Sequence, residues 1–194
     1  VEDGYREGDY SKVLNKPEAM KLVDQIVTCC KDPEYAGKTM GVISLQGNAQ
    51  SYHIRRLLTE KLGPEEIEKR GLICGDAYDF QGDERDIIFL SMVAATNERI
   101  GPLTKEADKR RFNVAVSRAK DQIWLFHSVT VNDLNQSDYR CILLAYFLNP
   151  FQPYWANGDW DFEKIRAEGI RRNQVAPPEP FGSWFEVDVY SQIW

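Results

Sequence analysis

Residues that bind metals or form disulfides are scarce in this 194-residue sequence, which has two histidines and four cysteines and no C-x-x-C pair. We therefore expect neither a zinc site nor a disulfide framework, and we interpret the cysteines as reduced thiols of a cytoplasmic protein. The sequence also lacks any run of 18 apolar residues and any signal-peptide pattern at its start. These absences predict a protein without a membrane partner.

An excess of basic residues is missing as well, because 24 Lys and Arg stand against 30 Asp and Glu, for a net charge of −6. This balance counts against nucleic acid as a partner of the whole surface, but it leaves room for a local basic face. The hydrophobic content of 43% is sufficient for one substantial core. Because the chain begins at Val1 and ends at Trp194 within an amphipathic pattern, we expect it to be a piece of a longer protein.

The order of apolar patterns predicts a layered α/β domain. Helical spacing occurs at residues 15–30, 51–62, 106–120 and 138–148, with a further short helix at 64–70. Apolar runs typical of buried strands occur at residues 39–46, 71–74, 87–93 and 122–129. The run 87–93 does not alternate, which indicates a strand covered on both faces, as in a parallel sheet. We therefore expect a parallel sheet sandwiched between helices in three layers, with ligands near the carboxyl ends of the strands.

Composition also predicts the domain boundaries. Residues 1–14 are polar and contain glycine, so we interpret them as an extended lead-in to a domain that ends near residue 148. Residues 149–180 are rich in Pro, Gly and aromatic residues, which is typical of a linker, here with one short helix. Residues 181–194 begin a new amphipathic stretch, which we interpret as the start of a truncated C-terminal domain.

The loop 75–86 carries side chains suited to a nucleotide or a metal ion. The pair Gln81-Gly82 allows the backbone to approach a ligand closely, because glycine has no Cβ. Glu84 projects near the start of a strand, where its carboxylate can accept a hydrogen bond from a ribose hydroxyl or a metal-bound water. An ordinary solvated turn explains the same residues, because acidic turns are common.

The stretch "KRRFNVAVSRAK" carries side chains suited to phosphate. Arg111 and Arg118 are seven residues apart and therefore lie on one flank of the expected helix. Two guanidinium groups on one flank can bind phosphate oxygens, and an arginine at a γ-phosphate stabilises the charge that develops during hydrolysis. A surface helix whose arginines pair with nearby carboxylates is the alternative. Likewise, Gln50 can contact a base or a phosphate, or simply hydrogen-bond the start of its own helix.

Taken together, the stretches "GVISLQGNAQSYHIRRLL", "GDAYDFQGDERDIIFLSMV" and "RRFNVAVSRAK" resemble motifs IV, V and VI of superfamily-1 helicases, in that order. The sequence is most similar to the Upf- and Dna-type branch, whose second RecA-like domain carries F-Q-G-x-E-x-D and R-x-N-V-A-x-[ST]-R-A-[KR]. The resemblance covers about residues 15–130. It implies a RecA-like, P-loop NTPase-like fold and the role of the C-terminal motor lobe of an ATP-dependent helicase or translocase.

The resemblance also implies roles for individual residues. Arg118 matches the motif VI arginine that reaches the ATP γ-phosphate, and Glu84 matches the motif V acid near the ribose and metal, so these two are the candidate catalytic residues. Gln81 and Gly82 match the loop that links the nucleotide state to nucleic acid. Arg111 matches the first basic position of motif VI, and it completes the candidate ATP-binding set with the other four.

The candidate nucleic-acid contacts are Gln50, Asp76, Tyr78 and Ser117. Two of these regions depart from the family pattern. Asp76 stands where many relatives have a threonine, so a hydroxyl suited to backbone phosphate is replaced by a carboxylate that repels it. Ser51 follows Gln50, where some relatives have an arginine. The resemblance implies single-stranded or duplex nucleic acid as a partner, with DNA favoured over RNA.

The sequence contains no G-x-x-x-x-G-K-[ST] phosphate cradle. In this family the cradle belongs to the first RecA-like domain, so the resemblance implies that ATP and Mg²⁺ are held mainly by an N-terminal RecA-like domain of the same chain. The present residues alone would then not hydrolyse ATP. A second interpretation is a non-catalytic RecA-like module that binds nucleic acid or protein.

The tail "FGSWFEVDVYSQI" is similar to the opening helix of restriction-endonuclease-like domains, with Glu186 as the helix acid. This similarity makes a helicase–nuclease fusion a third possibility. A docking helix explains the same residues.

Overall fold

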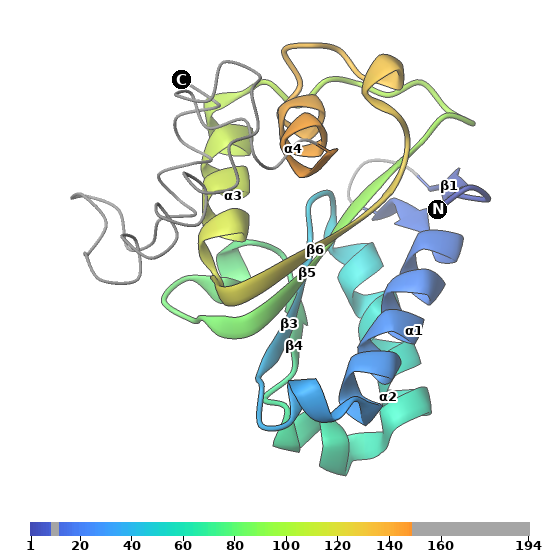
Figure 1. Cartoon of the computed structure of the whole chain (residues 1–194). Helices are drawn as coiled ribbons and strands as arrows, with labels where there is room; N and C mark the ends of the chain where they lie inside the picture. Colours follow the sequence, from blue (N-terminus) through green and yellow to red (C-terminus); the bar gives the residue numbers. More distant parts are fainter. Residues whose placement is uncertain (9–11, 149–194) are drawn as a thin grey trace, which may run out of the picture.

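The structure is a computed structural model, which describes residues 1–8 and 12–148 (Figure 1). Its centre is a four-stranded sheet with the strand order β4-β3-β5-β6, in which all neighbouring strands are parallel. The strands are β3 (Met40–Ser44), β4 (Ile73–Gly75), β5 (Arg85–Ala95) and β6 (Ala119–Ser128). The parallel sheet predicted from the sequence is therefore confirmed.

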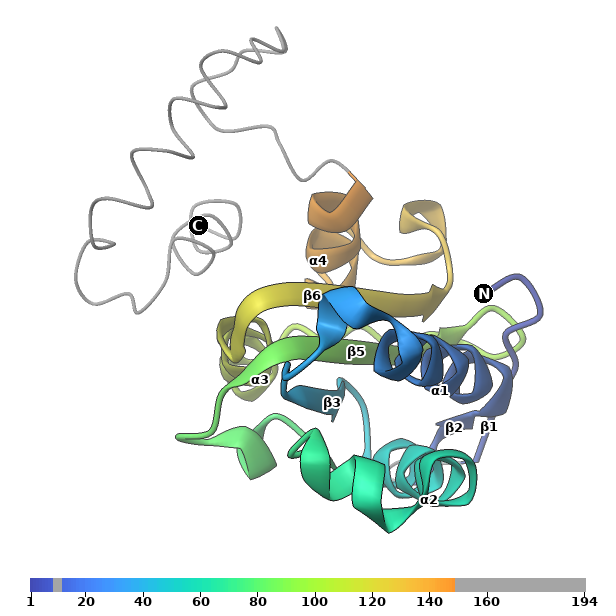
Figure 2. The ribbon, with the colours of Figure 1, turned by 60° about the horizontal axis from the view of Figure 1, so that its bottom comes forward.

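Helices cover both faces of the sheet (Figures 1 and 2). The helices are α1 (Lys16–Lys31), α2 (Asn48–Lys69), α3 (Glu106–Ser117) and α4 (Tyr139–Leu148). Apolar residues of α1 and α2 form one buried cluster with the near face of β3 and β5. Residues of α3 and α4 form a second buried cluster on the opposite face. The predicted three-layer α/β architecture is thus confirmed.

The start of α1 follows directly from its sequence. Asn15 is the N-cap, and its side-chain oxygen accepts a hydrogen bond of 3.2 Å from the backbone N–H of Glu18. Pro17 lies in the first turn, where a missing N–H costs nothing. Helix α2 combines the two predicted helices 51–62 and 64–70. They meet at a kink, where Gly63 has a φ of 74°.

The central strand β5 is buried from Ile87 to Ala95, as expected for a strand covered on both faces. It begins two residues earlier and ends two residues later than the predicted run. Strand β6 likewise begins at Ala119, directly after the end of α3, whereas the sequence predicted helix as far as residue 120. Pairing of Arg85 with Ala119 explains this shift, because the sheet extends into the last residues of the apparent helix pattern.

The predicted lead-in at residues 1–14 includes a short strand that pairs with the residues directly before α1. Strand β1 (Arg6–Glu7) pairs with β2 (Leu14–Asn15) in a small antiparallel sheet. The side chain of Asn97 fixes this hairpin to the end of β5, because it both accepts from the Arg6 N–H and donates to the Arg6 carbonyl, each at 2.8 Å. The expected boundaries near 148 and 180 lie at or beyond the end of the described residues.

Candidate functional site

The segment 76–84 connects the carboxyl edge of the sheet, where its parallel strands end, with the amino edge, where they begin. It leaves the carboxyl end of β4 after Gly75 and reaches the amino end of β5 at Arg85. Between these points, the short 3₁₀ turn η3 (Tyr78–Phe80) packs against α3 on one face of the sheet. Phe80 is completely buried, and a Cβ on Gly41 of β3 would lie only 2.6 Å from its ring. The close approach at Gly41 therefore anchors the middle of the segment on the sheet.

Carboxylates within the segment stabilise its own turn. The Asp76 carboxylate accepts hydrogen bonds from the backbone N–H of Tyr78 at 2.7 Å and of Asp79 at 3.2 Å. In return, the Asp79 carboxylate accepts from the Asp76 N–H at 2.9 Å. Asp76 and Asp79 thus have a structural role in this turn. The neighbouring Tyr78 ring, a candidate nucleic-acid contact, is half exposed.

Glu84 and Arg118 lie together at the amino edge of the sheet, although they come from separate segments. The N–H of Arg85 donates a hydrogen bond of 2.9 Å to the backbone carbonyl of Arg118. The Glu84 carboxylate lies 3.8 Å from the ammonium of Lys120, and both side chains are about half exposed. Gln81 and Gly82 are exposed in the same loop, and Gly82 has a φ of 84°, a conformation that favours glycine.

One nitrogen of the Arg118 side chain is buried. Its residue ends α3, and its side-chain Nε is buried without a hydrogen-bond partner among the described residues. Buried donors in folded proteins are usually paired, and two such atoms in the described residues are not, the Nε of Arg118 and the Nε of Arg6.

Arg111 lies in the middle of α3, roughly 10 Å along the helix axis from Arg118, because seven residues separate the two. Its guanidinium donates to the backbone carbonyl of Leu45, just past the carboxyl end of β3, at 3.4 Å. It also lies 3.6 Å from the Asp108 carboxylate. The structure thus brings four of the candidate ATP-binding residues to the amino edge, and it places Arg111 near the other edge.

Four candidate nucleotide residues, Gln81, Gly82, Glu84 and Arg118, lie at the amino edge of the sheet, whereas the sequence predicted ligands near the carboxyl ends of the strands. Helix α3 runs antiparallel to the strands, so its last residues lie at the start of β6. The segment 76–84 likewise delivers Glu84 to the start of β5. The two candidate residues therefore come directly before strands, Glu84 before β5 and Arg118 before β6.

The structure does not favour a nucleic-acid contact at Gln50, because the side chain is completely buried. Its amide oxygen accepts from the backbone N–H of Asn15 at 2.8 Å, and its amide nitrogen donates to the Asn15 carbonyl at 3.0 Å and to the Ser91 hydroxyl at 3.1 Å. Gln50 therefore joins the starts of α1 and α2. Similarly, the Ser117 hydroxyl donates to the Val114 carbonyl within its own helix at 3.0 Å.

A buried carboxyl group that the sequence did not single out lies at the carboxyl edge of the sheet. Glu18 is completely buried and accepts hydrogen bonds from the Ser91 hydroxyl at 2.6 Å, the Val93 N–H at 2.9 Å and the Ser128 hydroxyl at 3.2 Å. Burial raises its pKa to about 7, although these hydrogen bonds oppose the rise. Val93 has a φ of 69° within an irregular part of β5, so the carboxyl group fixes a strained backbone position.

A second buried polar cluster fixes the loop that follows β3. Arg140 of α4 and Asp138 are both buried and form an ion pair at 2.6 Å. The same guanidinium donates to the Gln46 side chain at 3.1 Å and to the Gly101 carbonyl at 2.6 Å. It thereby joins two loops of the carboxyl edge to α4. Sequence patterns showed Arg140 only as part of a helix, because its partners are far away along the chain.

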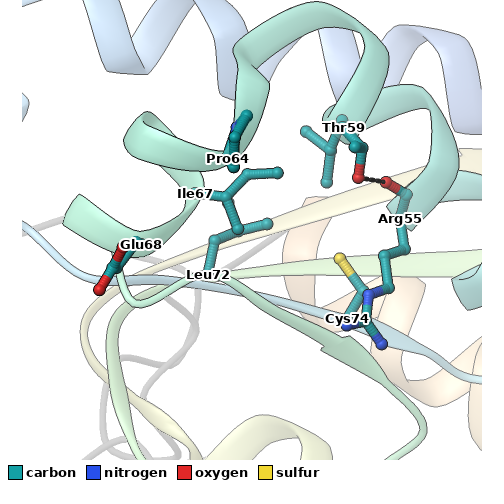
Figure 3. A pocket seen from close by; sticks show the side chains of 8 residues that line it. Arg55, Thr59, Pro64, Ile67, Glu68, Leu72 and Cys74 are labelled. Atoms are coloured by element: carbon teal, nitrogen blue, oxygen red, sulfur yellow. Dashed lines mark hydrogen bonds between the residues drawn. The ribbon is translucent and has the colours of Figure 1, made fainter.

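A pocket of about 250 Å³ lies beside the kink in α2. Figure 3 shows side chains that line it. The pocket is lined by Arg55, Leu58, Thr59, Pro64, Ile67, Glu68, Leu72 and Cys74. Burial raises the pKa of the Cys74 thiol to about 12, so this thiol stays protonated and unreactive. Within the described ranges, there is also no group of three or more His, Cys, Asp or Glu residues that could hold a metal ion.

None of the helices in the described part of the chain is both long and apolar enough to cross a membrane. The parallel sheet between two helical layers is the architecture of a RecA-like α/β domain. Residues 2–129 match a protein-family model described as an AAA domain, so the chain belongs to this family.

Three curated relatives have names that describe helicases. An uncharacterized ATP-dependent helicase of Mycoplasma genitalium is 30% identical over 183 residues, which cover 87% of this chain and 16% of that protein. Its homolog in Mycoplasma pneumoniae is 31% identical over 140 residues, covering 66% of this chain and 12% of that protein. The DNA polymerase alpha-associated DNA helicase A of Saccharomyces cerevisiae is 34% identical over 94 residues, covering 48% and 12% respectively. The chain thus spans only a small part of the length of each relative.

Proposed function

We propose that this chain is the C-terminal motor lobe of an ATP-dependent superfamily-1 helicase or translocase, and that Arg118 is its arginine finger. The observation that carries the proposal is the position of Arg118 beside the Glu84 loop, with a buried Nε that has no partner in the described part of the chain. Family membership and the helicase relatives support the same class of function.

In this proposal, ATP and Mg²⁺ lie between the amino edge of this sheet and an N-terminal RecA-like domain of the same protein. Arg118 contacts the γ-phosphate and stabilises the negative charge that grows during hydrolysis. Glu84, with Gln81 and Gly82, accepts hydrogen bonds from the ribose or from a metal-bound water. Arg111 contributes charge from the middle of α3, where it already donates a hydrogen bond to the Leu45 carbonyl.

The segment 76–84 provides a route from ATP to nucleic acid. Its first residue, Asp76, lies at the carboxyl end of β4, and its last residue, Glu84, lies at the amino end of β5. Because one short segment joins the two edges and packs on the sheet through Phe80, a displacement at Glu84 would change the packing of the whole segment. We therefore place the nucleotide at the amino edge and the nucleic acid at the carboxyl edge.

The remaining parts of the proposal concern the whole protein. The motor domain ends near residue 148, a linker follows to about residue 180, and residues 181–194 begin a further domain. DNA is the favoured nucleic acid, in agreement with the name of the yeast relative. A cytoplasmic location fits the four cysteines, all of which are free thiols.

The alternative function is a non-catalytic nucleic-acid or protein-binding module that retained the RecA-like shape. The bonds of Asp76 and Arg111 favour it, because both side chains already have partners within the domain. The two functions differ in the role of Arg118.

The test is the nucleic-acid-stimulated ATPase rate of the full-length protein with Arg118→Ala. We expect a loss of about 10³-fold or more, as for other arginine fingers. Arg110→Ala is the matched control, because Arg110 is an exposed arginine of the same helix. A normal rate for Arg118→Ala would refute the arginine-finger role. Absence of nucleic-acid-stimulated ATPase in the unaltered full-length protein would support the non-catalytic module.

A further inference from the structure

An exposed tyrosine lies near the start of α2, at the carboxyl edge of the sheet. Tyr52 is 67% exposed, the largest value among the large apolar side chains in the described ranges. Helix α2 begins at Asn48, a few residues after β3 ends. Aromatic rings are among the side chains that folding usually covers, so one that projects from a rigid helix is available to a partner.

Two positively charged side chains come from the helix turns next to Tyr52. Arg56 lies four residues after Tyr52 and therefore on the same side of α2. Lys16 begins α1, and both cations are well exposed although they form ion pairs, Arg56 with Glu60 at 3.6 Å and Lys16 with Glu7 at 2.5 Å.

His53 lies between Tyr52 and Arg56 in the sequence, and its pKa depends on the nearby charges. Its pKa is lowered first by burial and then by the charges of Arg56 and Lys16, whose effects exceed the opposing effects of Glu60 and Glu7. Both cations therefore act near the start of α2, although each also pairs with one of these acids, in a chain whose net charge is −6.

Buried hydrogen bonds hold this surface in one geometry. Gln50 exchanges two hydrogen bonds with the backbone of Asn15, at 2.8 and 3.0 Å, and so joins the first turn of α2 to the start of α1. The Glu18 carboxyl group, through Ser91, fixes the start of α1 to the end of β5. Tyr52, Arg56 and Lys16 therefore project from helix turns that cannot shift relative to each other without breaking buried bonds.

We propose that Tyr52, Lys16 and Arg56 form a contact surface for single-stranded nucleic acid. Tyr52 stacks on one base, and the two cations bind the flanking phosphates. The pairing of an exposed ring with flanking cations fits this partner, because a single strand presents bases and phosphates together. The proposal rests on the proposed function. In place of the buried Gln50, it names Tyr52 and Arg56 of the same helix and Lys16 of α1 as the contacts.

The test is the affinity of the full-length protein for a fluorescein-labelled oligothymidylate, measured by anisotropy without nucleotide. We expect Tyr52→Ala to weaken binding by about 5- to 100-fold, as for other base-stacking residues, and Tyr52→Phe to retain it. Because a phosphate contact on a single strand contributes a slope of about 0.7 to the salt dependence, Lys16→Ala and Arg56→Ala should each lower the slope by about that amount.

Arg110→Ala is the control, because it removes an exposed cation of α3 while leaving this surface intact. Circular dichroism of each variant verifies the fold. An unchanged affinity for Tyr52→Ala would overturn the proposal, including the case where Tyr52 contacts a protein instead. Since the assay needs no ATP hydrolysis, failure of the motor function leaves this result interpretable, and loss of binding leaves the Arg118 test intact.

Discussion

The N–H of Arg85 donates a 2.9 Å hydrogen bond to the carbonyl of Arg118, which joins the residue after Glu84 to the end of α3. This hydrogen bond lies at the start of the β5–β6 pairing, in which Arg85 and Ala119 are the first paired residues. An acid from one loop and an arginine from one helix are thereby held at a common edge. Neither residue could be moved away without opening the central sheet.

Removing the Glu84 carboxylate should lower ATPase turnover. We expect Glu84→Ala in the full-length protein to reduce the nucleic-acid-stimulated rate by about 10-fold or more, because the proposed acceptor for ribose or metal-bound water is lost. Asp83→Ala is the control, since Asp83 is an exposed neighbouring carboxylate paired with Arg85. Equal rates for the two variants would exclude a specific role for Glu84.

The buried Glu18 predicts how stability changes with pH. Its pKa rises from 4.5 to about 7 on folding, so the folded state binds the proton more tightly than the unfolded state. The contribution of Glu18 to stability is therefore complete below pH 4.5 and is lost as the pH rises through about 7. Glu18→Gln should remove this dependence, so that its stability relative to wild type improves by up to roughly 3 kcal/mol between pH 5 and pH 8.

Urea unfolding at several pH values measures this difference for residues 1–194 or the full-length protein. Parallel pH profiles for wild type and Glu18→Gln would show that the Glu18 pKa is not raised.

Breaking the buried ion pair of α4 should destabilise the domain strongly. Arg140→Ala leaves the Asp138 carboxylate buried without its guanidinium partner, which typically costs about 3–5 kcal/mol. It also frees the loop residue Gln46. Arg140→Ala combined with Asp138→Ala should recover part of the loss in chemical denaturation. A loss below about 1 kcal/mol for the single variant would contradict the buried placement.

Gly41 tests the close approach between β3 and the segment 76–84. A Cβ at this position would lie 2.6 Å from the Phe80 ring and 2.9 Å from the Ile88 side chain. We expect Gly41→Ala to lower the free energy of unfolding by about 1–3 kcal/mol, as for other overpacked cores. Gly101→Ala is the control, because a Cβ there meets open space. Similar stabilities for both variants in denaturant titrations would mean that Phe80 does not pack tightly on β3.

Periodicity in the sequence was sufficient to predict the four helical regions and the parallel sheet, because α1 and β5 carry patterns set by burial on one or both sides. It located the junction of α3 and β6 poorly, since the pairing of Arg85 with Ala119 is a long-range event. Hydrogen bonds across the fold override local pattern at such boundaries.

The site was predictable only in part, for a similar reason. The motif positions of Glu84 and Arg118 indicated two residues whose backbones lie close together at one edge, and their roles stay predictions. The burial of Gln50 was not predictable, because its partners Asn15 and Ser91 come from distant segments. The same holds for Glu18, which looked like an ordinary residue of a helix's first turn.

The central claim is that Arg118 binds the γ-phosphate of ATP. The most direct measurement is a crystal structure of the full-length protein with a non-hydrolysable ATP analogue. We predict that the Arg118 guanidinium lies within hydrogen-bond distance of a γ-phosphate oxygen, at the amino edge of the sheet beside Glu84. A nucleotide bound elsewhere, with Arg118 directed away from its phosphates, would contradict the claim.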